Sequence, residues 1–377
     1  MKIFKKLILL VLVSLFVFSI TGCGEKKVDN TSSEEESQVV TSQSTLANNK
    51  EIKIAYIAMP NAAPQVLINK KEKIFESLLA EEGYTVKWVL TRSLDNIWPM
   101  MDKDEVDFVY IPTQNFITYV TETSDFGGSD KYRIIAGSLE HDFFLLMVDS
   151  KIKSLKELEN KTVGIVNKFY VEEMALNKQL ENVGLSTKSM GGTVEIEYLD
   201  WMNKLWDNFS SGEYAGIVTW TSVQGAVEKN IPNSKLLLNL NEGEENGPSL
   251  PQNSLIAKKD LIDNKSEIVN LILKAHIEAT EISLENKDEL PLLAKSTYED
   301  YYEKVLKAAD YPKYSKEFMI NDWKESEPTY DPNLAYIKEA YDFTVKAGYL
   351  KNKELENLID TKPINEVLVE LNKSPIK

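Results

Sequence analysis

The fold is decided by residues 51–111, which read EIKIAYIAMPNAAPQVLINKKEKIFESLLAEEGYTVKWVLTRSLDNIWPMMDKDEVDFVYI. Three apolar runs in this stretch, at 52–58, 85–90 and 106–111, are rich in β-branched and aromatic residues, as strands are. After the first run, apolar residues recur at helical spacing from about 64 to 82, and Gly83 then suits a helix end. Strands that alternate with helices predict an α/β fold with a parallel, doubly wound sheet.

The same pattern repeats further along the chain. Runs typical of strands occupy 132–136, 143–148, 162–166, 194–199 and 215–220, with a loop expected at 137–142 and helices at about 171–183 and 201–210. Residues 254–257 are interpreted as a strand that returns to the first sheet, and the chain from Lys265 onward is expected to be mostly helical. We therefore expect a two-lobe, monomeric α/β protein: residues 51–138 with 250–377 form lobe 1, and residues 139–249 form lobe 2.

The N-terminal segment indicates export and attachment to a membrane. Three lysines precede an apolar run at 7–20, which is shorter than the roughly 20 residues that cross a bilayer and suits a signal peptide. Ile20-Thr21-Gly22-Cys23 follows and resembles a bacterial lipobox, whose cysteine is acylated after cleavage. We expect residues 1–22 to be a lipoprotein signal peptide, Cys23 the lipidated residue, and 23–50 a flexible polar tether. The alternative is an ordinary signal peptide with an incidental cysteine.

Composition narrows the classes of function. The formal net charge is −16, which disfavours nucleic-acid binding because phosphate contacts need basic surfaces. A single cysteine excludes an intramolecular disulfide, and two distant histidines give no zinc-ligand cluster. The sequence contains no nucleophile elbow, P-loop or dinucleotide-binding glycine motif. We expect a protein that is not an enzyme and that uses no metal or cofactor.

Five segments, taken in order, resemble one family. They are DEVDF at 104–108, DSKIKSLKELENKTVG at 149–164, SGEYA at 211–215, the helix at 275–282 and the glycine-capped segment at 341–350. They resemble the ABC-transporter periplasmic solute-binding proteins for nitrate, sulfonates, taurine and thiamine-precursor pyrimidines. The resemblance implies a type II periplasmic-binding-protein-like fold, with parallel-rich sheets and a ligand between the lobes. It also implies delivery of that ligand to a permease and an ATPase on separate chains.

Candidate ligand contacts follow from the topology. Loops after parallel strands meet at one edge of a sheet, and helix N-termini there offer free N–H groups. Trp220 ends a strand at such an edge, whereas Arg92 is either an anion clamp or an exposed loop residue, and His141 is either a contact or a structural hydrogen-bonding group. His276 is expected on a surface helix, and Trp206 in the core. The ligand-binding residues expected on these grounds are Asn61, Arg92, Thr113, Gln114, His141, Phe169, Tyr170, Trp201, Trp220 and Thr221.

Two ligand classes remain open at this point. Aromatic candidates and a total of two arginines favour a flat heteroaromatic ring such as a thiamine-precursor pyrimidine, held by stacking. A sulfonate- or nitrate-type anion would instead use helix N-termini with Arg92 or Lys168. The expected function is an extracytoplasmic, lipid-anchored substrate-binding protein of an ABC importer. The alternative is a membrane-tethered sensor that binds a ligand without transporting it.

Overall fold

The computed structural model describes residues 50–59, 62–91, 93–122, 131–141, 144–166, 170–199, 202–240, 250–308, 313–324, 326–350 and 355–376. The signal peptide, Cys23 and nearly all of the tether lie outside the described residues. Residues 50–377 form one compact unit. Within the described part of the chain, no helix is both long enough and apolar enough to cross a lipid bilayer.

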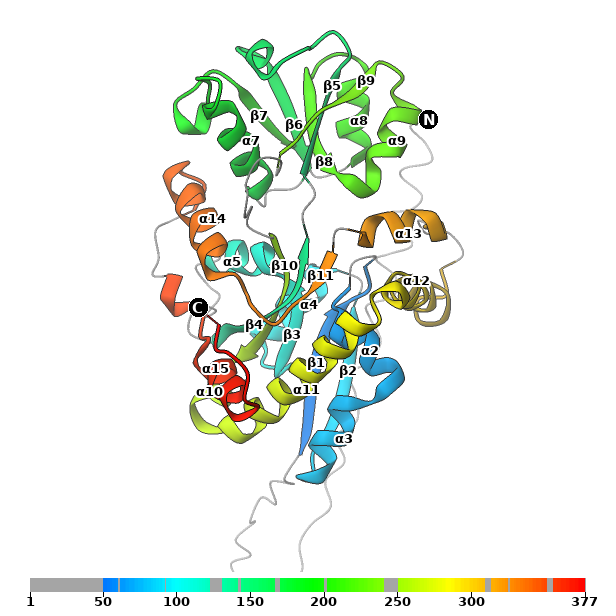
Figure 1. Ribbon diagram of the computed structural model, residues 1–377, viewed down its shortest axis with the longest axis vertical. Coiled ribbons are helices and arrows are strands. Elements are labelled where there is room, and N and C mark those ends of the chain that lie inside the picture. Colours follow the sequence, from blue (N-terminus) through cyan, green and yellow to red (C-terminus); the bar gives the residue numbers. More distant parts are fainter. Residues whose placement is uncertain are drawn as a thin grey trace, which may run out of the picture. The chain divides into compact units, whose positions relative to one another are not determined.

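The first sheet contains six strands in the order β11-β4-β10-β3-β1-β2 (Figure 1). Strands β1, β2 and β3 are parallel, and β10 lies antiparallel between β3 and β4. The strand that returns from the second sheet is therefore where the sequence predicts it. The bounds are β1 Glu51–Ile57, β2 Thr85–Thr91, β3 Phe108–Pro112, β4 Tyr132–His141, β10 Leu250–Lys258 and β11 Ser326–Pro328.

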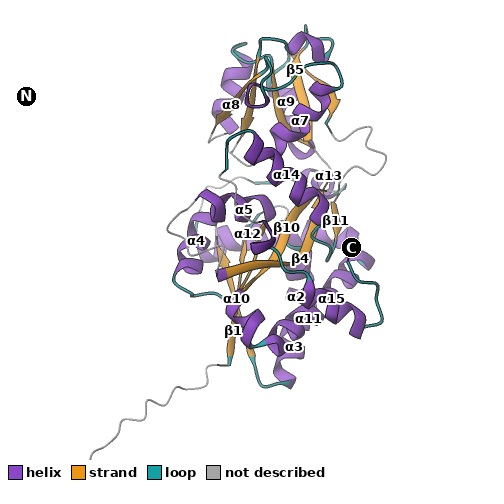
Figure 2. Ribbon diagram, turned by 90° about the vertical axis from the view of Figure 1, so that its left-hand side faces the viewer, coloured by secondary structure: helices purple, strands orange, loops and turns teal. Residues whose placement is uncertain are grey.

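Helices cover both faces of this sheet (Figure 2). Ile54 of β1 packs with α2, α3 and α11 on one face, whereas Ala55 packs with α4, α5 and α14 on the other. This alternation is what a strand buried on both faces requires. The helices are α2 Pro64–Glu72, α3 Ile74–Glu81, α4 Leu94–Asp102, α5 Thr113–Glu122, α10 Lys259–Asn264, α11 Ser266–Glu285, α12 Leu290–Asp300, α13 Lys316–Trp323, α14 Leu334–Lys346 and α15 Lys362–Glu370, with short turns η4 Lys287–Glu289, η5 Tyr301–Val305 and η6 Leu355–Asn357.

The second sheet contains five strands in the order β7-β6-β8-β5-β9. Strands β6, β7 and β8 are parallel, and β5 and β9 complete the sheet in antiparallel pairs. Val218 of β8 packs with α7 on one face, and Ile217 packs with α8 and α9 on the other. The bounds are β5 Phe144–Asp149, β6 Thr162–Val166, β7 Glu195–Leu199, β8 Gly216–Trp220, β9 Ser234–Asn239, α7 Val171–Glu181, α8 Met202–Ser210, α9 Gln224–Asn230, and short turns η1 Leu155–Leu158, η2 Lys188–Met190 and η3 Thr221–Val223.

Helix α14 belongs to the cores of both sheets. Tyr336, Ala340 and Phe343 pack into the cluster around β6 and α7. Ile337 and Tyr341, on another side of the helix, pack into the cluster around β3 and α5. The fold is thus the two-lobe α/β arrangement with a helical C-terminal region that the sequence predicts, and α14 joins its two halves. The exact lobe boundaries stay a prediction.

Three details of the sequence interpretation are wrong. The helix predicted from 64 to 82 is broken at Lys73, whose φ of 58° ends α2 before α3 begins. The loop predicted at 137–142 is wrong for residues 137–141, because β4 continues to His141 with β10 on one side and β11 on the other. His276 is fully buried rather than on the surface, since α11 is covered by α2, α3 and α15.

The buried His276 has a defined partner. Its Nδ1 lies 2.8 Å from the hydroxyl of Tyr110, and the two rings stack at 5.8 Å between centroids. Burial lowers the pKa of His276 to about 3, although a hydrogen bond with the backbone of Gly137 acts in the opposite direction. The neutral imidazole therefore joins α11 to the core of the first sheet.

Candidate functional site

The carboxyl ends of the parallel strands form one edge in each sheet. In the first sheet Ile57 pairs with Thr91, and Pro112 pairs with Asn253, which also pairs with Leu139 of β4. In the second sheet the corresponding ends are Val166, Leu199 and Trp220. Loops and helix N-termini that follow these strands therefore gather at two edges, as the sequence predicts.

The covalent chain ties these two edges together. Strand β4 ends at His141, at the carboxyl edge of the first sheet, and β5 begins at Phe144. Phe144 pairs with Trp220, so β5 starts at the carboxyl edge of the second sheet. Three Cα–Cα steps join His141 to Phe144, and they can span at most about 11 Å. A small molecule at one edge is therefore within reach of the other.

Half of the predicted contacts cannot be placed. Asn61, Arg92, Phe169 and Trp201 lie outside the described residues, and so do Lys168 and the side chain of His141. The backbone of His141 pairs with Leu250 and Ser326 at the carboxyl edge of the first sheet. The roles of Asn61, Arg92, His141, Phe169 and Trp201 as ligand contacts stay predictions.

Thr113 and Gln114 begin α5 directly after β3. Thr113 is buried, and its hydroxyl lies 2.8 Å from that of Ser254 on β10, so this hydroxyl already has a partner within the first sheet. Gln114 is also buried, but its side-chain nitrogen has no hydrogen-bond partner among the described residues. Of the two, Gln114 has the polar atom that is available to a ligand.

Tyr170, Trp220 and Thr221 lie at the carboxyl edge of the second sheet. Tyr170 precedes α7 in the left-handed region, with φ of 67°, and its ring stacks on Tyr349 at 4.3 Å between centroids. Trp220 is half-buried and packs against the clusters on both faces of the sheet. The hydroxyl of Thr221 is buried and lacks a hydrogen-bond partner in the described part of the chain.

The sequence interpretation did not select two further residues of the same kind. Glu172, in the first turn of α7, and Gln252, near the start of β10, each have a buried side-chain oxygen without a hydrogen-bond partner among the described residues. With Gln114 and Thr221 they are four such groups on the two carboxyl edges. Thr219, one residue before the end of β8, is a fifth nearby, and Thr193 and Trp206 have such atoms elsewhere in the described residues. Buried polar atoms in folded proteins are nearly always satisfied, so groups left open mark places where water or a ligand binds.

Glu173 organises the N-terminal end of α7. This fully buried carboxylate accepts hydrogen bonds from the hydroxyls of Ser189 at 2.5 Å, Tyr198 at 2.5 Å and Tyr349 at 2.7 Å. Burial and then the neighbouring carboxylate raise the pKa of Tyr198, so its hydroxyl remains a donor. Tyr349 follows α14, and the cluster therefore joins the C-terminal region to the second sheet.

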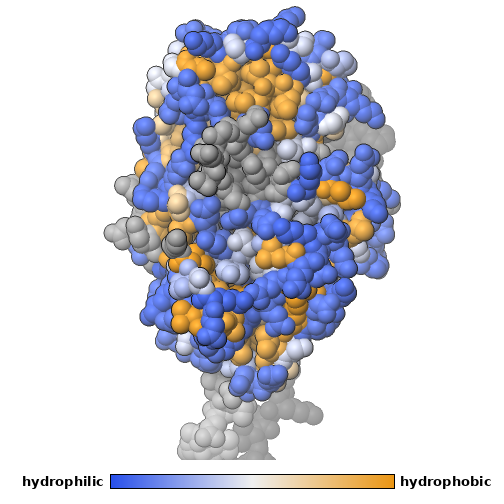
Figure 3. All heavy atoms as spheres, viewed as in Figure 1, coloured by the Kyte–Doolittle hydropathy of each residue, from blue (hydrophilic) through white to orange (hydrophobic). Residues whose placement is uncertain are grey.

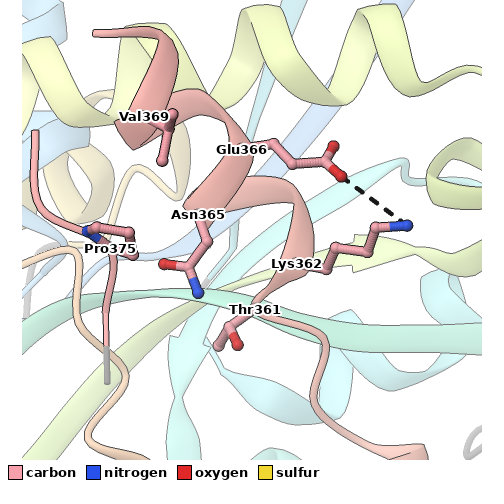
Figure 4. A pocket seen from close by; sticks show the side chains of 6 residues that line it. All are labelled: Thr361, Lys362, Asn365, Glu366, Val369 and Pro375. Atoms are coloured by element: carbon pink, nitrogen blue, oxygen red, sulfur yellow. Dashed lines mark ion pairs between the residues drawn. The ribbon is translucent and has the colours of Figure 1, made fainter. Parts of the chain in front are cut away.

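One surface hollow in the described part of the chain lies away from these edges. It measures about 620 Å³ and is lined by Thr361, Lys362, Asn365, Glu366, Val369 and Pro375 (Figure 4). Lys362 and Glu366 lie toward each other, 3.8 Å apart, and both are largely exposed. The backbone of Asp360 bonds to Ile134, near the first residues of β4 and far along that strand from His141. This hollow is open to solvent and lies away from the carboxyl edges. Hydrophilic residues predominate on the face of the molecule shown in Figure 3.

The two sheets, with carboxyl edges joined by the link at 141–144, define a class of fold. It is the fold of the type II periplasmic binding proteins, which confirms the fold predicted from the sequence. A family model described as "NMT1/THI5 like" matches residues 132–290, somewhat less than half of the chain. This match confirms the resemblance stated above over those residues. No curated protein is detectably similar to the chain in sequence.

Solved structures with this fold include binding proteins and an enzyme. One, assigned as the periplasmic sulfonate-binding protein SsuA of a sulfonate ABC transporter from Methylobacillus flagellatus KT, is 14% identical with a TM-score of 0.61, covering 86% of this chain and 97% of that one. The periplasmic aliphatic sulphonate-binding protein SsuA from Escherichia coli is 12% identical with a TM-score of 0.60, covering 82% and 92%. DSZB in complex with biphenyl-2-sulfinic acid is 12% identical with a TM-score of 0.58, covering 85% and 99%. At these identities the likeness concerns the fold.

Proposed function

We propose that the protein is the substrate-binding component of an ABC importer, anchored outside the cytoplasm by lipid on Cys23. It captures a small solute between the two carboxyl edges and delivers it to a permease and an ATPase on separate chains. One observation carries the proposal: four buried polar groups that lack hydrogen-bond partners among the described residues, Gln114, Glu172, Thr221 and Gln252, lie on these edges. The sulfonate-binding proteins that share the fold support a solute-binding role. DSZB, a desulfurization enzyme, has the same fold, so the fold alone does not establish the role.

Two substitutions test the ligand class predicted from the sequence. If the ligand is a ring stacked on Trp220, Trp220→Ala is expected to weaken binding at least tenfold, or about 1.4 kcal/mol, and Arg92→Ala to have little effect. If it is a small anion, Arg92→Ala removes a charge-assisted hydrogen bond of about 1.5–3 kcal/mol, and the ranking reverses. Isothermal titration calorimetry with one pyrimidine and one sulfonate measures both.

The control for charge is Lys204→Ala, which removes an exposed cation on α8 and is expected to leave both affinities unchanged. If neither Trp220→Ala nor Arg92→Ala alters the binding of a solute that wild-type protein binds, the site does not lie at these strand ends.

Attachment to the membrane is tested separately. Cys23→Ser removes the expected acylation site, and the protein should then leave the membrane fraction, because the apolar run at 7–20 serves as a signal rather than as a span. Fractionation followed by immunoblotting measures the partition, with Ser32→Ala in the tether as the matched control. A Cys23→Ser protein that is cleaved after its signal peptide and still sediments with membranes would show that lipid on Cys23 is not the anchor.

A further inference from the structure

Glu172 is an unusual residue for a protein interior. It occupies the second position of α7, just beyond the carboxyl end of β6, and its side chain is only 3% exposed. One carboxylate oxygen has no hydrogen-bond partner among the described residues. Burying a carboxyl group with an unsatisfied oxygen is costly, and among the described residues this side chain has only a hydrogen bond with its own backbone in return. A residue of this kind is more consistent with a binding role than with a structural one.

The surroundings of Glu172 disfavour an anionic ligand. The N-terminus of a helix usually attracts anions. At the N-terminus of α7, however, the space is already lined by two buried acidic residues of the first turn, Glu172 and Glu173. Glu173 has three hydroxyl donors, whereas Glu172 has an open oxygen. A sulfonate placed here would lie beside the Glu173 carboxylate in a region of low dielectric constant, where repulsion between like charges is strong.

The same surroundings suit a nitrogen group. Burial raises the pKa of Glu172 to about 8, so the carboxyl group holds a proton near neutral pH when no ligand is present. A cation alongside would favour the ionised carboxylate and form a charge-assisted hydrogen bond with it. Tyr170 and Tyr198 lie next to this turn with their rings at 82° to each other, so an apolar or aromatic body has rings to pack against.

We infer that the solute bound at this edge presents a nitrogen group with N–H donors, such as an amine, an amidine or an amino-substituted ring, to the open oxygen of Glu172. The inference rests on the proposed function and specifies the chemistry of its ligand. It departs from the sulfonates named for the proteins that share the fold. The groups that cover Glu172 must move to admit the ligand, as hinge motion between two lobes allows.

Two probes of similar size and opposite charge test this inference. Benzamidine and benzenesulfonate share one ring and differ in the group that Glu172 would meet. The full-length protein is compared with Glu172→Met, which keeps side-chain length and helix propensity. The matched control is Glu267→Met, because Glu267 occupies the same second position in α11 but is exposed. Ligand-observed NMR measures both affinities, and thermal unfolding measures stability without ligand.

The inference predicts opposite effects on binding and stability. Wild type and Glu267→Met should bind benzamidine at least tenfold more tightly than benzenesulfonate, and Glu172→Met should lose this preference. Without ligand, Glu172→Met should melt about 2–4 °C higher than wild type, because it no longer buries an open carboxyl oxygen. A lower melting temperature would assign Glu172 to the fold and overturn the inference.

Three other results would also overturn the inference. They are tighter binding of benzenesulfonate than of benzamidine by wild type, an unchanged preference for benzamidine in Glu172→Met, and binding of neither probe. Preference for benzenesulfonate would leave the proposed solute-binding function standing, so the failures of the two proposals are distinguishable.

Discussion

Glu173→Ala is expected to lower the free energy of unfolding by about 3 kcal/mol or more, because it leaves three hydroxyl donors without their acceptor. Ser189, Tyr198 and Tyr349 all donate to this one buried carboxylate. A hydroxyl left unpaired away from water costs about 1–3 kcal/mol; the three donors here are half-buried, and the cavity left by the fully buried Glu173 side chain adds to the cost. Urea unfolding followed by circular dichroism measures the change.

The control for this prediction is Glu195→Ala. Glu195 is also acidic and lies in the same lobe, but its ion pair with Lys188 is largely exposed. Exposed pairs contribute about 0–1 kcal/mol, so this variant should unfold close to wild type. Tyr349→Phe, which removes one of the three donors, should fall between the two. Equal stability of Glu173→Ala and Glu195→Ala would show that the cluster does not hold α7 to the C-terminal region.

Gly137→Ala is expected to destabilise the protein by about 3 kcal/mol, because the backbone of another segment occupies the space for a side chain. A Cβ atom built on Gly137 would lie 2.1 Å from the carbonyl oxygen of Asp331. The amide of Gly137 also donates a 3.0 Å hydrogen bond to the carbonyl of Tyr330. The clash involves backbone on both sides, so neither partner can yield by rotating a side chain. Thermal and urea unfolding measure the loss.

Gly225→Ala provides a control of opposite sign. Gly225 lies in α9, and a Cβ there would meet nothing within 4 Å. Alanine is favoured over glycine in a helix by up to about 1 kcal/mol, so this variant should be as stable as wild type or more so. Wild-type stability of Gly137→Ala would show that the segment before α14 does not pack against β4 as described.

The sequence predicts the fold well where the pattern is local. Runs such as 52–58 and 106–111 bury residues on both faces, so their composition alone indicates central parallel strands. Prediction from the sequence fails where segments far apart in the chain determine whether a residue is paired or buried. Strand β4 continues past Gly137 because β10 and β11 supply partners from far along the chain. His276 is buried because α15, near the C-terminus, covers part of α11.

The candidate site follows the same division. The position of Gln114 and Thr221 at strand ends comes from topology, which the sequence reveals. The open carboxyl oxygen of Glu172 could not be predicted from the sequence, because acidic residues in the first turn of a helix are usually exposed and stabilise the helix there. An acidic pair shortly after a predicted cleft-facing strand is the only local signal, and the tyrosines that contact Glu173 in the structure, Tyr198 and Tyr349, come from later in the chain.

Native mass spectrometry of the protein purified from its own host, in detergent, tests the central claim most directly. A protein that captures a solute between two lobes should carry one small molecule per chain through purification. We predict an added mass that disappears after unfolding and refolding, and that returns when an extract of host metabolites is supplied. A bare chain in both the purified and the extract-treated samples would contradict the proposed solute-binding function.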